Sequence, residues 1–215
     1  MIKFVINKAG IKKTVKTDIK SSQLVKSKRL QIAIGASRLF IKKGYFQTSI
    51  REISKETGIT IGNLYDYISG KEDILYLVFD VFHSMWLDKL TEEGIFKMEE
   101  PVKQLEVAIR KMLELVNSHR EMIFLMYTET KLLQKDYLEI ILEKEARLVK
   151  YFEDILRRGI EKKVFKIKDP FFMANVIVYM LSLEPLRGWN LRKSYKVEQI
   201  NRLNGNFILD NILKR

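Results

Sequence analysis

The sequence predicts an all-α protein with a three-helix head, which contains a helix-turn-helix, and a larger helical bundle behind it. Three observations carry this prediction. The 215 residues include only 3 Pro and 10 Gly, which leaves room for long helices. Residues 49–67, SIREISKETGITIGNLYDY, carry the start and stop signals of two short helices. From residue 101 onward, apolar residues recur at helical spacing in one long segment after another.

The two short helices begin and end at identifiable residues. Ser49 and Glu52 have the capping-box spacing, in which each side chain pairs with the other residue's backbone N–H at a helix start. Gly58 can adopt the left-handed conformation that ends a helix, and Thr60 can cap a second helix that reaches Ile68. This arrangement is typical of a helix-turn-helix, whose second helix enters the DNA major groove. An ordinary helical corner fits the same spacing.

Helices are also expected on both sides of this motif. One runs from Ser27 and ends at Gly44, directly after two lysines. The next starts at Lys71 and has apolar residues on more than one face, so we expect it to contact both the head and the bundle. The junction between the two parts is therefore expected inside this helix. Residues 1–27 hold seven lysines and fit either a short hairpin or a loose basic arm.

The formal net charge of +12 is concentrated near the N-terminus. Residues 1–75 hold 15 Lys or Arg against 6 Asp or Glu, whereas residues 76–215 hold 24 against 21. A basic face beside a helix-turn-helix is the electrostatic pattern of phosphate binding. A solvated lysine-rich surface is the simpler explanation for the first 27 residues.

Several classes of protein are excluded by what the sequence lacks. The absence of Cys excludes disulfides, thiolate zinc sites and a cysteine nucleophile. No apolar run approaches the roughly 18 residues of a membrane span, so we expect a cytoplasmic protein without a membrane partner. The histidines, His83 and His119, stand far apart without metal-ligand spacing and are expected at the surface or at helix caps. Without a phosphate loop or a serine elbow, we expect no catalysis, no cofactor and no metal.

The head also resembles a known family. The matching segments are RLQIAIGASRLF (29–40), GYFQTS (44–49), Ile53, Gly58, TIGNLY (60–65) and KEDIL (71–75). Together they resemble the TetR/AcrR family of transcriptional regulators. Two positions depart from the family pattern. Gly70 stands where Ser or Asn is usual, but Gly is a tolerable helix cap, and Ile68 stands where Phe is usual, but Ile is also apolar.

The resemblance implies a division of the chain and a function. Residues 1–27 form a basic N-terminal extension, residues 28–75 a helix-turn-helix DNA-binding domain, and residues 76–215 a helical ligand-binding and dimerisation domain. The implied protein is a homodimeric repressor on a palindromic operator of double-stranded DNA, released by a small-molecule effector. The alternative from another class is an architectural DNA-binding protein that responds to no ligand.

The candidate DNA-binding residues follow from position and from the resemblance. Thr60, Ile61 and Asn63 open the second short helix, where side chains point at base edges. Asn63 could pair with adenine, and Ile61 could touch a thymine methyl group. By resemblance to the family, the phosphate contacts are Thr48, Tyr65, Tyr67 and Lys71. The simpler roles are core packing for Tyr65 and capping for Thr48, and these are compatible with a phosphate contact.

The second half of the chain predicts helices over about 101–117, 119–133 and 135–163. Asp169 and Pro170 open a further helix that ends or kinks at Pro185, and Ser194 could cap the last helix. Residues 171–183 are apolar on every side, which is too much for a helix with a solvent face. We therefore expect the last two helices to pair with those of a second copy.

The predicted ligand-binding residues combine apolar bulk with one carboxylate: Met112, Phe124, Tyr127, Glu129, Phe152, Met180 and Trp189. Each of the apolar ones is also an ordinary core residue. Residues 127–133 and 152–159, with Phe165, loosely resemble the acyl-CoA-responsive branch of the family, which implies an apolar or acyl-CoA effector. The rival interpretation is a multidrug sensor of an efflux system, in which Glu129 or Glu184 balances a cationic ligand among aromatic rings.

Overall fold

A computed structural model describes residue 15 and residues 22–92 and 94–213, and this part of the chain is helical without a strand. The all-α prediction is therefore confirmed. The helices are α1 (Ser22–Lys43), α2 (Ile50–Thr57), α3 (Ile61–Tyr65), α4 (Lys71–Glu92), α5 (Pro101–Ser118), α6 (Arg120–Glu129), α7 (Lys135–Glu161), α8 (Pro170–Leu181), α9 (Leu183–Leu191) and α10 (Val197–Asp210). Two single 3-10 turns, η1 (Ile95–Lys97) and η2 (Thr130–Leu132), precede α5 and α7.

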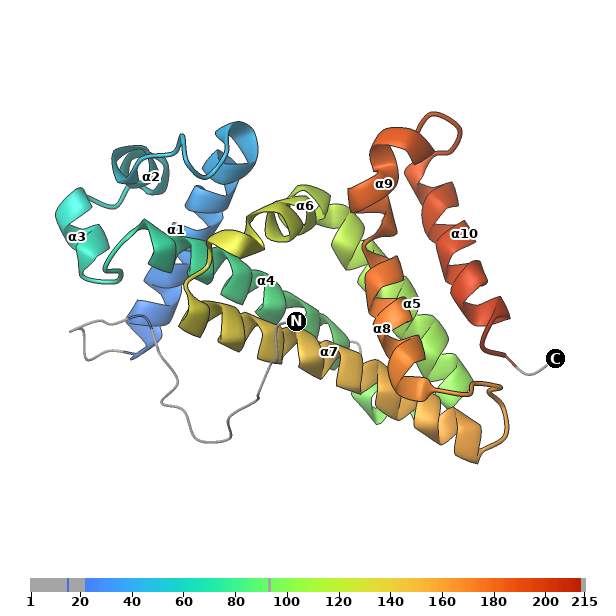
Figure 1. The fold of residues 1–215 in the computed structure, drawn as a ribbon. Coiled ribbons are helices and arrows are strands. Elements are labelled where there is room, and N and C mark those ends of the chain that lie inside the picture. Colours follow the sequence, from blue (N-terminus) through green and yellow to red (C-terminus); the bar gives the residue numbers. More distant parts are fainter. Residues whose placement is uncertain (1–14, 16–21, 93, 214–215) are drawn as a thin grey trace.

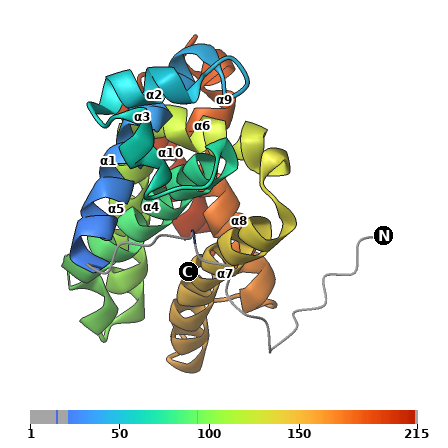
Figure 2. The ribbon, with the colours of Figure 1, turned by 90° about the vertical axis from the view of Figure 1, so that its left-hand side faces the viewer.

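Helices α1, α2 and α3 form the head at one end of the molecule, and α8, α9 and α10 lie at the other end (Figure 1). The long helices α4 and α7 run side by side between the two ends (Figures 1 and 2). Helix α7 also packs on α5 and α8, and α5 contacts α10. The body is thus a bundle whose central helices reach the head.

Helix α4 belongs to two hydrophobic cores. Its first half contributes Ile74, Leu75, Val78 and Phe79 to the core of the head, and its second half contributes Trp86 and Leu90 to the core of the body. The head core also contains Tyr137 and Ile141 from the start of α7. This explains why the apolar residues of α4 cover more than one face, and it leaves the middle of the helix, around residues 82–84, between the cores.

The N-terminal extension predicted over residues 1–27 falls mostly outside the described residues. Within it, Val15 is buried against the head, and its carbonyl accepts a hydrogen bond from the Arg29 guanidinium. Helix α1 starts at Ser22, not at Ser27 as predicted. Val25 is buried in the head core, so the additional turn of helix has an apolar anchor.

Other helix boundaries also differ from the prediction. The helix predicted over about 119–133 ends at Glu129 and is followed by the 3-10 turn η2. The second short helix ends at Tyr65 rather than Ile68. Helix α8 ends with Ser182 as its C-cap, before Pro185. Pro185 lies in the first turn of α9, where a backbone N–H has no partner within the helix, so a proline is tolerated. The last helix is capped by Lys196 instead of Ser194. The break at Ser182 separates α8 from α9. Helix α9 was not predicted as a separate helix, because the apolar pattern continues without interruption across the break.

Candidate nucleic-acid interface and ligand cavity

The caps of the helix-turn-helix form as predicted. Ser49 N–H donates to the Glu52 carboxylate at 2.8 Å, and Glu52 N–H donates to the Ser49 hydroxyl at 3.3 Å. Gly58 ends α2 with φ of 67°, in the left-handed region that suits glycine. The Thr60 hydroxyl caps α3 by accepting from Asn63 N–H at 3.3 Å. Both helices of the motif are therefore held by their own sequence.

Helix α3 is fixed to the head on one side and open to solvent on the other. Leu64 is fully buried in the core that also contains Ile53, and the partly buried Leu39 packs against that core. The neighbouring side chains of α3 are exposed, and they form what we call the reading surface: Thr60, Ile61, Asn63 and Tyr65. The buried leucine thus orients a short helix whose remaining side chains are available to a partner.

The predicted phosphate contacts do not all lie on this surface. Tyr65 is 51% exposed, so it does not pack in the core, whereas Tyr67 is 6% exposed and its carbonyl accepts from Arg29 Nε at 3.3 Å. Thr48 is also buried, and its hydroxyl donates to the Gly44 carbonyl at 2.9 Å. Thr48 and Tyr67 therefore hold the turn and the core of the head.

Lys71 lies beside the turn that precedes α2. Its ammonium group donates to the Phe46 carbonyl at 3.3 Å and lies 4.2 Å from the centre of the Tyr45 ring. Burial lowers the pKa of Lys71 and raises that of Tyr45 to about 12. Phe46 is 75% exposed, and it was not among the candidates predicted from the sequence. The available signal was the pair of aromatic residues, Tyr45 and Phe46, that follows the helix stop at Gly44.

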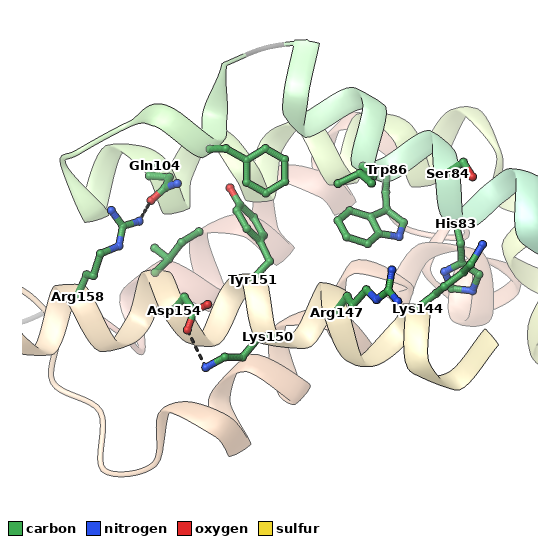
Figure 3. Close-up of a pocket in the computed structure, with 13 residues that line it drawn as sticks. His83, Ser84, Trp86, Gln104, Lys144, Arg147, Lys150, Tyr151, Asp154 and Arg158 are labelled. Atoms are coloured by element: carbon green, nitrogen blue, oxygen red, sulfur yellow. Dashed lines mark hydrogen bonds and ion pairs between the residues drawn. The ribbon is translucent and has the colours of Figure 1, made fainter. Parts of the chain in front are cut away.

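A cavity of about 550 Å³ lies between α4, η1, α5 and α7, and we call it the basic cavity (Figure 3). Its apolar walls come from α4, η1 and α7: Trp86, Leu87, Phe96, Tyr151 and Ile155. Four cations of α7 line it as well: Lys144, Arg147, Lys150 and Arg158. The cavity therefore combines aromatic surface with positive charge along one helix.

The four cations differ in how they are engaged. Lys144 pairs with Asp80 of α4, and Lys150 pairs with Asp154 at 2.8 Å. Arg158 donates to the side chain of Gln104 and to the Met98 carbonyl at 3.4 Å. Arg147 has no ion pair among the described residues. Burial raises the pKa of Tyr151 to about 12, so its phenol is a neutral hydrogen-bond donor beside these charges.

His83 was predicted at the surface or at a cap, and this prediction is wrong. The side chain lies in the middle of α4 and is 4% exposed, because α4 is covered there by the other helices of the body. Its Nδ1 is 3.7 Å from Glu145 Oε2, which is too long for a hydrogen bond. Burial lowers the pKa of His83 to about 4. His119 does occupy a cap, at the end of α5.

A second, smaller hollow of about 50 Å³ adjoins the basic cavity and shares His83 and Trp86 as wall residues. We call it the inner chamber. Its other polar wall residues are Tyr127, Glu145 and Ser182, and the remaining walls are apolar.

The seven predicted ligand-binding residues are not brought together. Met112 and Tyr127 line the inner chamber. Phe152 is fully buried in the body core, and Met180 packs against that core. The other three line a separate groove of about 630 Å³ between α1, α6 and α9: Phe124, Glu129 and Trp189. None of the seven lines the basic cavity.

No residue that lines the basic cavity was a named ligand-binding candidate, although Asp154, Ile155 and Arg158 fall in the segment 152–159 that resembles the acyl-CoA-responsive branch. A signal was present, because Lys144, Arg147 and Lys150 recur at three-residue spacing and share one face of α7 with Tyr151. Among the other polar candidates, Glu184 is buried and already paired with Arg192 at 2.7 Å. The described residues include no cluster that could hold a metal ion, and none of the described helices has the length and apolarity of a membrane span.

Two family models match this architecture. The model described as "Bacterial regulatory proteins, tetR family" matches residues 33–76, and the model described as "Tetracyclin repressor-like, C-terminal domain" matches residues 98–183. Together they match more than half of the chain. The chain belongs to the TetR family of bacterial transcriptional regulators. The family resemblance of the head is thereby confirmed, and with it the role of the head in DNA binding.

Relatives of this TetR-family chain are regulators as well. It is 29% identical over 168 residues to the HTH-type transcriptional regulator HbdR of Aromatoleum sp. (strain CIB), which covers 78% of this chain and 69% of HbdR. The structure of AibR in complex with isovaleryl coenzyme A and operator DNA matches with a TM-score of 0.71 at 20% identity, over 83% of this chain and 96% of AibR. FadR from Bacillus subtilis in complex with stearoyl-CoA matches with a TM-score of 0.68 at 20% identity, over 85% and 98%. The two structural matches show a shared fold.

Proposed function

We propose that this TetR-family protein is a non-catalytic, homodimeric repressor that binds a palindromic operator and is released when an acyl-CoA occupies the basic cavity. The observation that carries the proposal is the basic cavity itself, which four cations of α7 line together with aromatic side chains from α4, η1 and α7. Helix α4 begins in the head and lines the cavity, so one rigid element serves both sites. Because it acts on DNA, the proposed location is the cytoplasm.

The operator would be read by the reading surface. Asn63 presents an amide that can bond bidentately to adenine, and the exposed Ile61 suits a thymine methyl group. Tyr65 and Lys71 flank these residues and supply the phosphate contacts that set the position on the duplex. In a symmetric dimer, two such helices enter successive major grooves about 34 Å apart.

The effector is assigned from the charges in the basic cavity. Phosphate groups of CoA would meet Arg147 and its cationic neighbours, since guanidinium groups bind phosphate in a planar, bidentate way. Trp86 and Tyr151 offer the aromatic surface for the rest of the ligand. AibR is bound to isovaleryl coenzyme A, and FadR to stearoyl-CoA, in the matching structures. Their shared ligand class supports an acyl-CoA here.

A cationic effector fits less well. The net positive lining of the basic cavity would repel it. Glu184, one of the two carboxylates suggested for such a ligand, is occupied by Arg192. Glu129 lies in the groove between α1, α6 and α9, together with Arg120 and Arg192. The charges that line the two hollows therefore do not favour the multidrug alternative.

The dimer would form through α8 and α10. Both helices present large apolar side chains to solvent: Phe172, Tyr179, Leu203 and Phe207. Phe172 and Tyr179 are seven residues apart, and Leu203 and Phe207 are four apart, so each pair shares one helix face. Pairing these faces with those of a second copy would bury them in a four-helix interface. We expect Phe207→Glu to convert the dimer into monomers in sedimentation measurements, with Lys103→Glu at an exposed position of α5 as the control.

The signal would travel through α4 and α7, which are linked by polar contacts as well as by packing. Asp73 of α4 accepts hydrogen bonds from Ser69 N–H at 2.6 Å and from the Tyr137 hydroxyl of α7. Tyr76 stacks on Tyr137, with 4.3 Å between the ring centres. A ligand between α4 and α7 would favour the arrangement of these helices that fits it best and so shift the population of DNA-binding geometries.

Footprinting on genomic fragments, without ligand and with an acyl-CoA or a cationic dye, separates the candidates. The proposal expects protection of a palindrome, relieved by the acyl-CoA and unaffected by the dye. Relief by the dye alone would support the multidrug sensor. Protection without a palindrome, insensitive to every ligand, would support the architectural protein. Turnover of the acyl-CoA during the experiment would contradict a non-catalytic role.

A further inference from the structure

The inner chamber brings together polar atoms that have no partner. Both ring nitrogens of His83 and the indole Nε1 of Trp86 are buried without a hydrogen bond among the described residues. In Figure 3, the indole nitrogen of Trp86 and the ring of His83 lie toward the same end of the basic cavity. Buried polar atoms are nearly always paired in folded proteins, because leaving them unpaired costs free energy. These three atoms therefore point to an occupant that pairs with them.

The size of the inner chamber limits that occupant. Its volume of about 50 Å³ holds roughly four water-sized groups at ~10–15 Å³ each. Apolar side chains close it on the remaining sides, among them Met112, Val116 and Ile123. These residues are buried in the packed interior, so a long chain could not pass beyond them without displacing the core. A group of only a few heavy atoms fits.

We propose that the inner chamber binds the acyl end of the effector and selects a short acyl group that carries a hydroxyl, in preference to a long saturated chain. This assignment rests on the proposed acyl-CoA function of the adjoining basic cavity. A hydroxyl both donates and accepts a hydrogen bond. It can donate to the unprotonated nitrogen of His83 and accept from the indole N–H of Trp86. An alkyl chain in the same place would leave all three atoms unpaired and without water.

The protonation state of His83 agrees with this pairing. Its pKa is lowered to about 4 by burial, so the imidazole is neutral at pH 7 and offers one donor and one acceptor. The charged and titratable groups around it are Asp80 on its own helix and Lys144 and Glu145 on α7, with Tyr127 across the chamber. The hydroxyl therefore meets a polar but uncharged partner.

The basic cavity would then determine the affinity for CoA, and the inner chamber would determine the selectivity for the acyl group. The cations of the basic cavity would contact the part of the ligand that every acyl-CoA shares, so they set affinity and cannot distinguish acyl groups. His83 and Trp86 line both hollows and would contact the part that differs. Affinity for CoA and selectivity for the acyl group should thus respond to different substitutions.

Calorimetric titration of the full-length protein with CoA, butyryl-CoA, 3-hydroxybutyryl-CoA and palmitoyl-CoA tests this separation. We expect 3-hydroxybutyryl-CoA to bind about tenfold or more tightly than butyryl-CoA, and palmitoyl-CoA to gain nothing from its length. His83→Leu should reduce the ratio between the two four-carbon ligands to less than about threefold. Arg147→Gln should weaken all four ligands by a similar factor and leave that ratio unchanged.

The outcomes distinguish the two proposals. Binding of acyl-CoAs with equal affinity for the two four-carbon ligands, or with the tightest binding for palmitoyl-CoA, would overturn the selectivity and leave the proposed function standing. Absence of binding for all four ligands would overturn the proposed function. The wild-type series needs no variant, so it decides the question even if His83→Leu fails to fold.

Discussion

In the head, the polar groups that shape the two short helices are paired by caps and turns, whereas the middle of α4 carries polar atoms without partners. Ser49, Glu52 and Thr60 satisfy the helix starts of the head, and Leu64 fills its core. Around His83 and Trp86, buried nitrogens are unpaired and two hollows adjoin. The difference shows that the head pairs its own polar groups, whereas the middle of the body leaves buried nitrogens that we propose the effector pairs with.

The largest effect is expected from a substitution that damages the packing of the head. Leu64→Ala should lower the free energy of unfolding by about 2–5 kcal/mol, because it leaves a cavity in a fully packed core. It should also abolish operator binding, since α3 loses its anchor. Urea unfolding and a gel-shift assay measure the two effects.

Ile61→Ala is the matched control on the same helix, because Ile61 is exposed. It should change stability by no more than about 0.5 kcal/mol and alter base preference only. Equal destabilisation by the two variants would show that α3 is not anchored through Leu64.

The second test uses pH on the unpaired histidine. Burial lowers the pKa of His83 from 6.5 to about 4. Between these two pH values the imidazole is protonated in the unfolded chain and neutral in the folded chain. Its contribution to stability is therefore complete above pH 6.5 and is lost as the pH falls toward 4. This span corresponds to about 3 kcal/mol, which urea titrations at a series of pH values can measure.

His83→Leu should remove this part of the pH dependence. Burial raises the pKa of Glu145, which faces His83 at 3.7 Å and titrates with the opposite sign, so Glu145→Gln in the same series separates the two groups. An unchanged slope between pH 6.5 and 4 in His83→Leu would show that the histidine is not buried in its neutral form.

The third test concerns the link between the two regions. Tyr137→Phe deletes the buried hydrogen bond to Asp73 and should lower the free energy of unfolding by about 2 kcal/mol. Its wider effect should be a weaker response of operator binding to the effector, with effector binding itself unchanged. Tyr195→Phe, at an exposed position, is the control and should leave both properties at wild-type values.

The smallest expected effect is at the rim of the basic cavity. Arg147 is exposed and has no ion pair among the described residues, so Arg147→Gln should change stability by no more than about 0.5 kcal/mol. Affinity for CoA should fall about tenfold, which corresponds to ~1.4 kcal/mol. Lys103→Gln on α5 removes an equivalent surface charge away from the cavity and should leave affinity unchanged. A stability loss without an affinity loss would contradict the assignment of Arg147 to ligand binding.

The head was predictable from the sequence because its signals are local. The capping box of Ser49 and Glu52, the stop at Gly58 and the cap at Thr60 each act over a few residues, and all formed as expected. The roles of Tyr65 and Tyr67 were not predictable in the same way. Which of the two is buried depends on where α3 ends, and it ends at Tyr65, earlier than the apolar pattern indicates.

The basic cavity could not be predicted because it depends on long-range packing. Trp86, Phe96 and Tyr151 lie on three elements, and their juxtaposition follows from how α4 and α7 pair. Apolar composition did not distinguish pocket from core, since Phe152 is fully buried while Tyr151 beside it lines the cavity. The buried His83 was missed for the same reason: its neighbours in space come from α7.

The central claim is that occupancy of the basic cavity controls operator binding through α4. The most direct test is to titrate the operator-bound protein with 3-hydroxybutyryl-CoA and follow DNA release by fluorescence anisotropy, for wild type and for the Arg147→Gln, Lys150→Gln double variant. We expect release of the wild type, an increase of about tenfold or more in the half-release concentration of the variant, and equal operator affinity of both proteins without ligand. Operator binding that ignores the acyl-CoA, or release at the same concentration in both proteins, would contradict it.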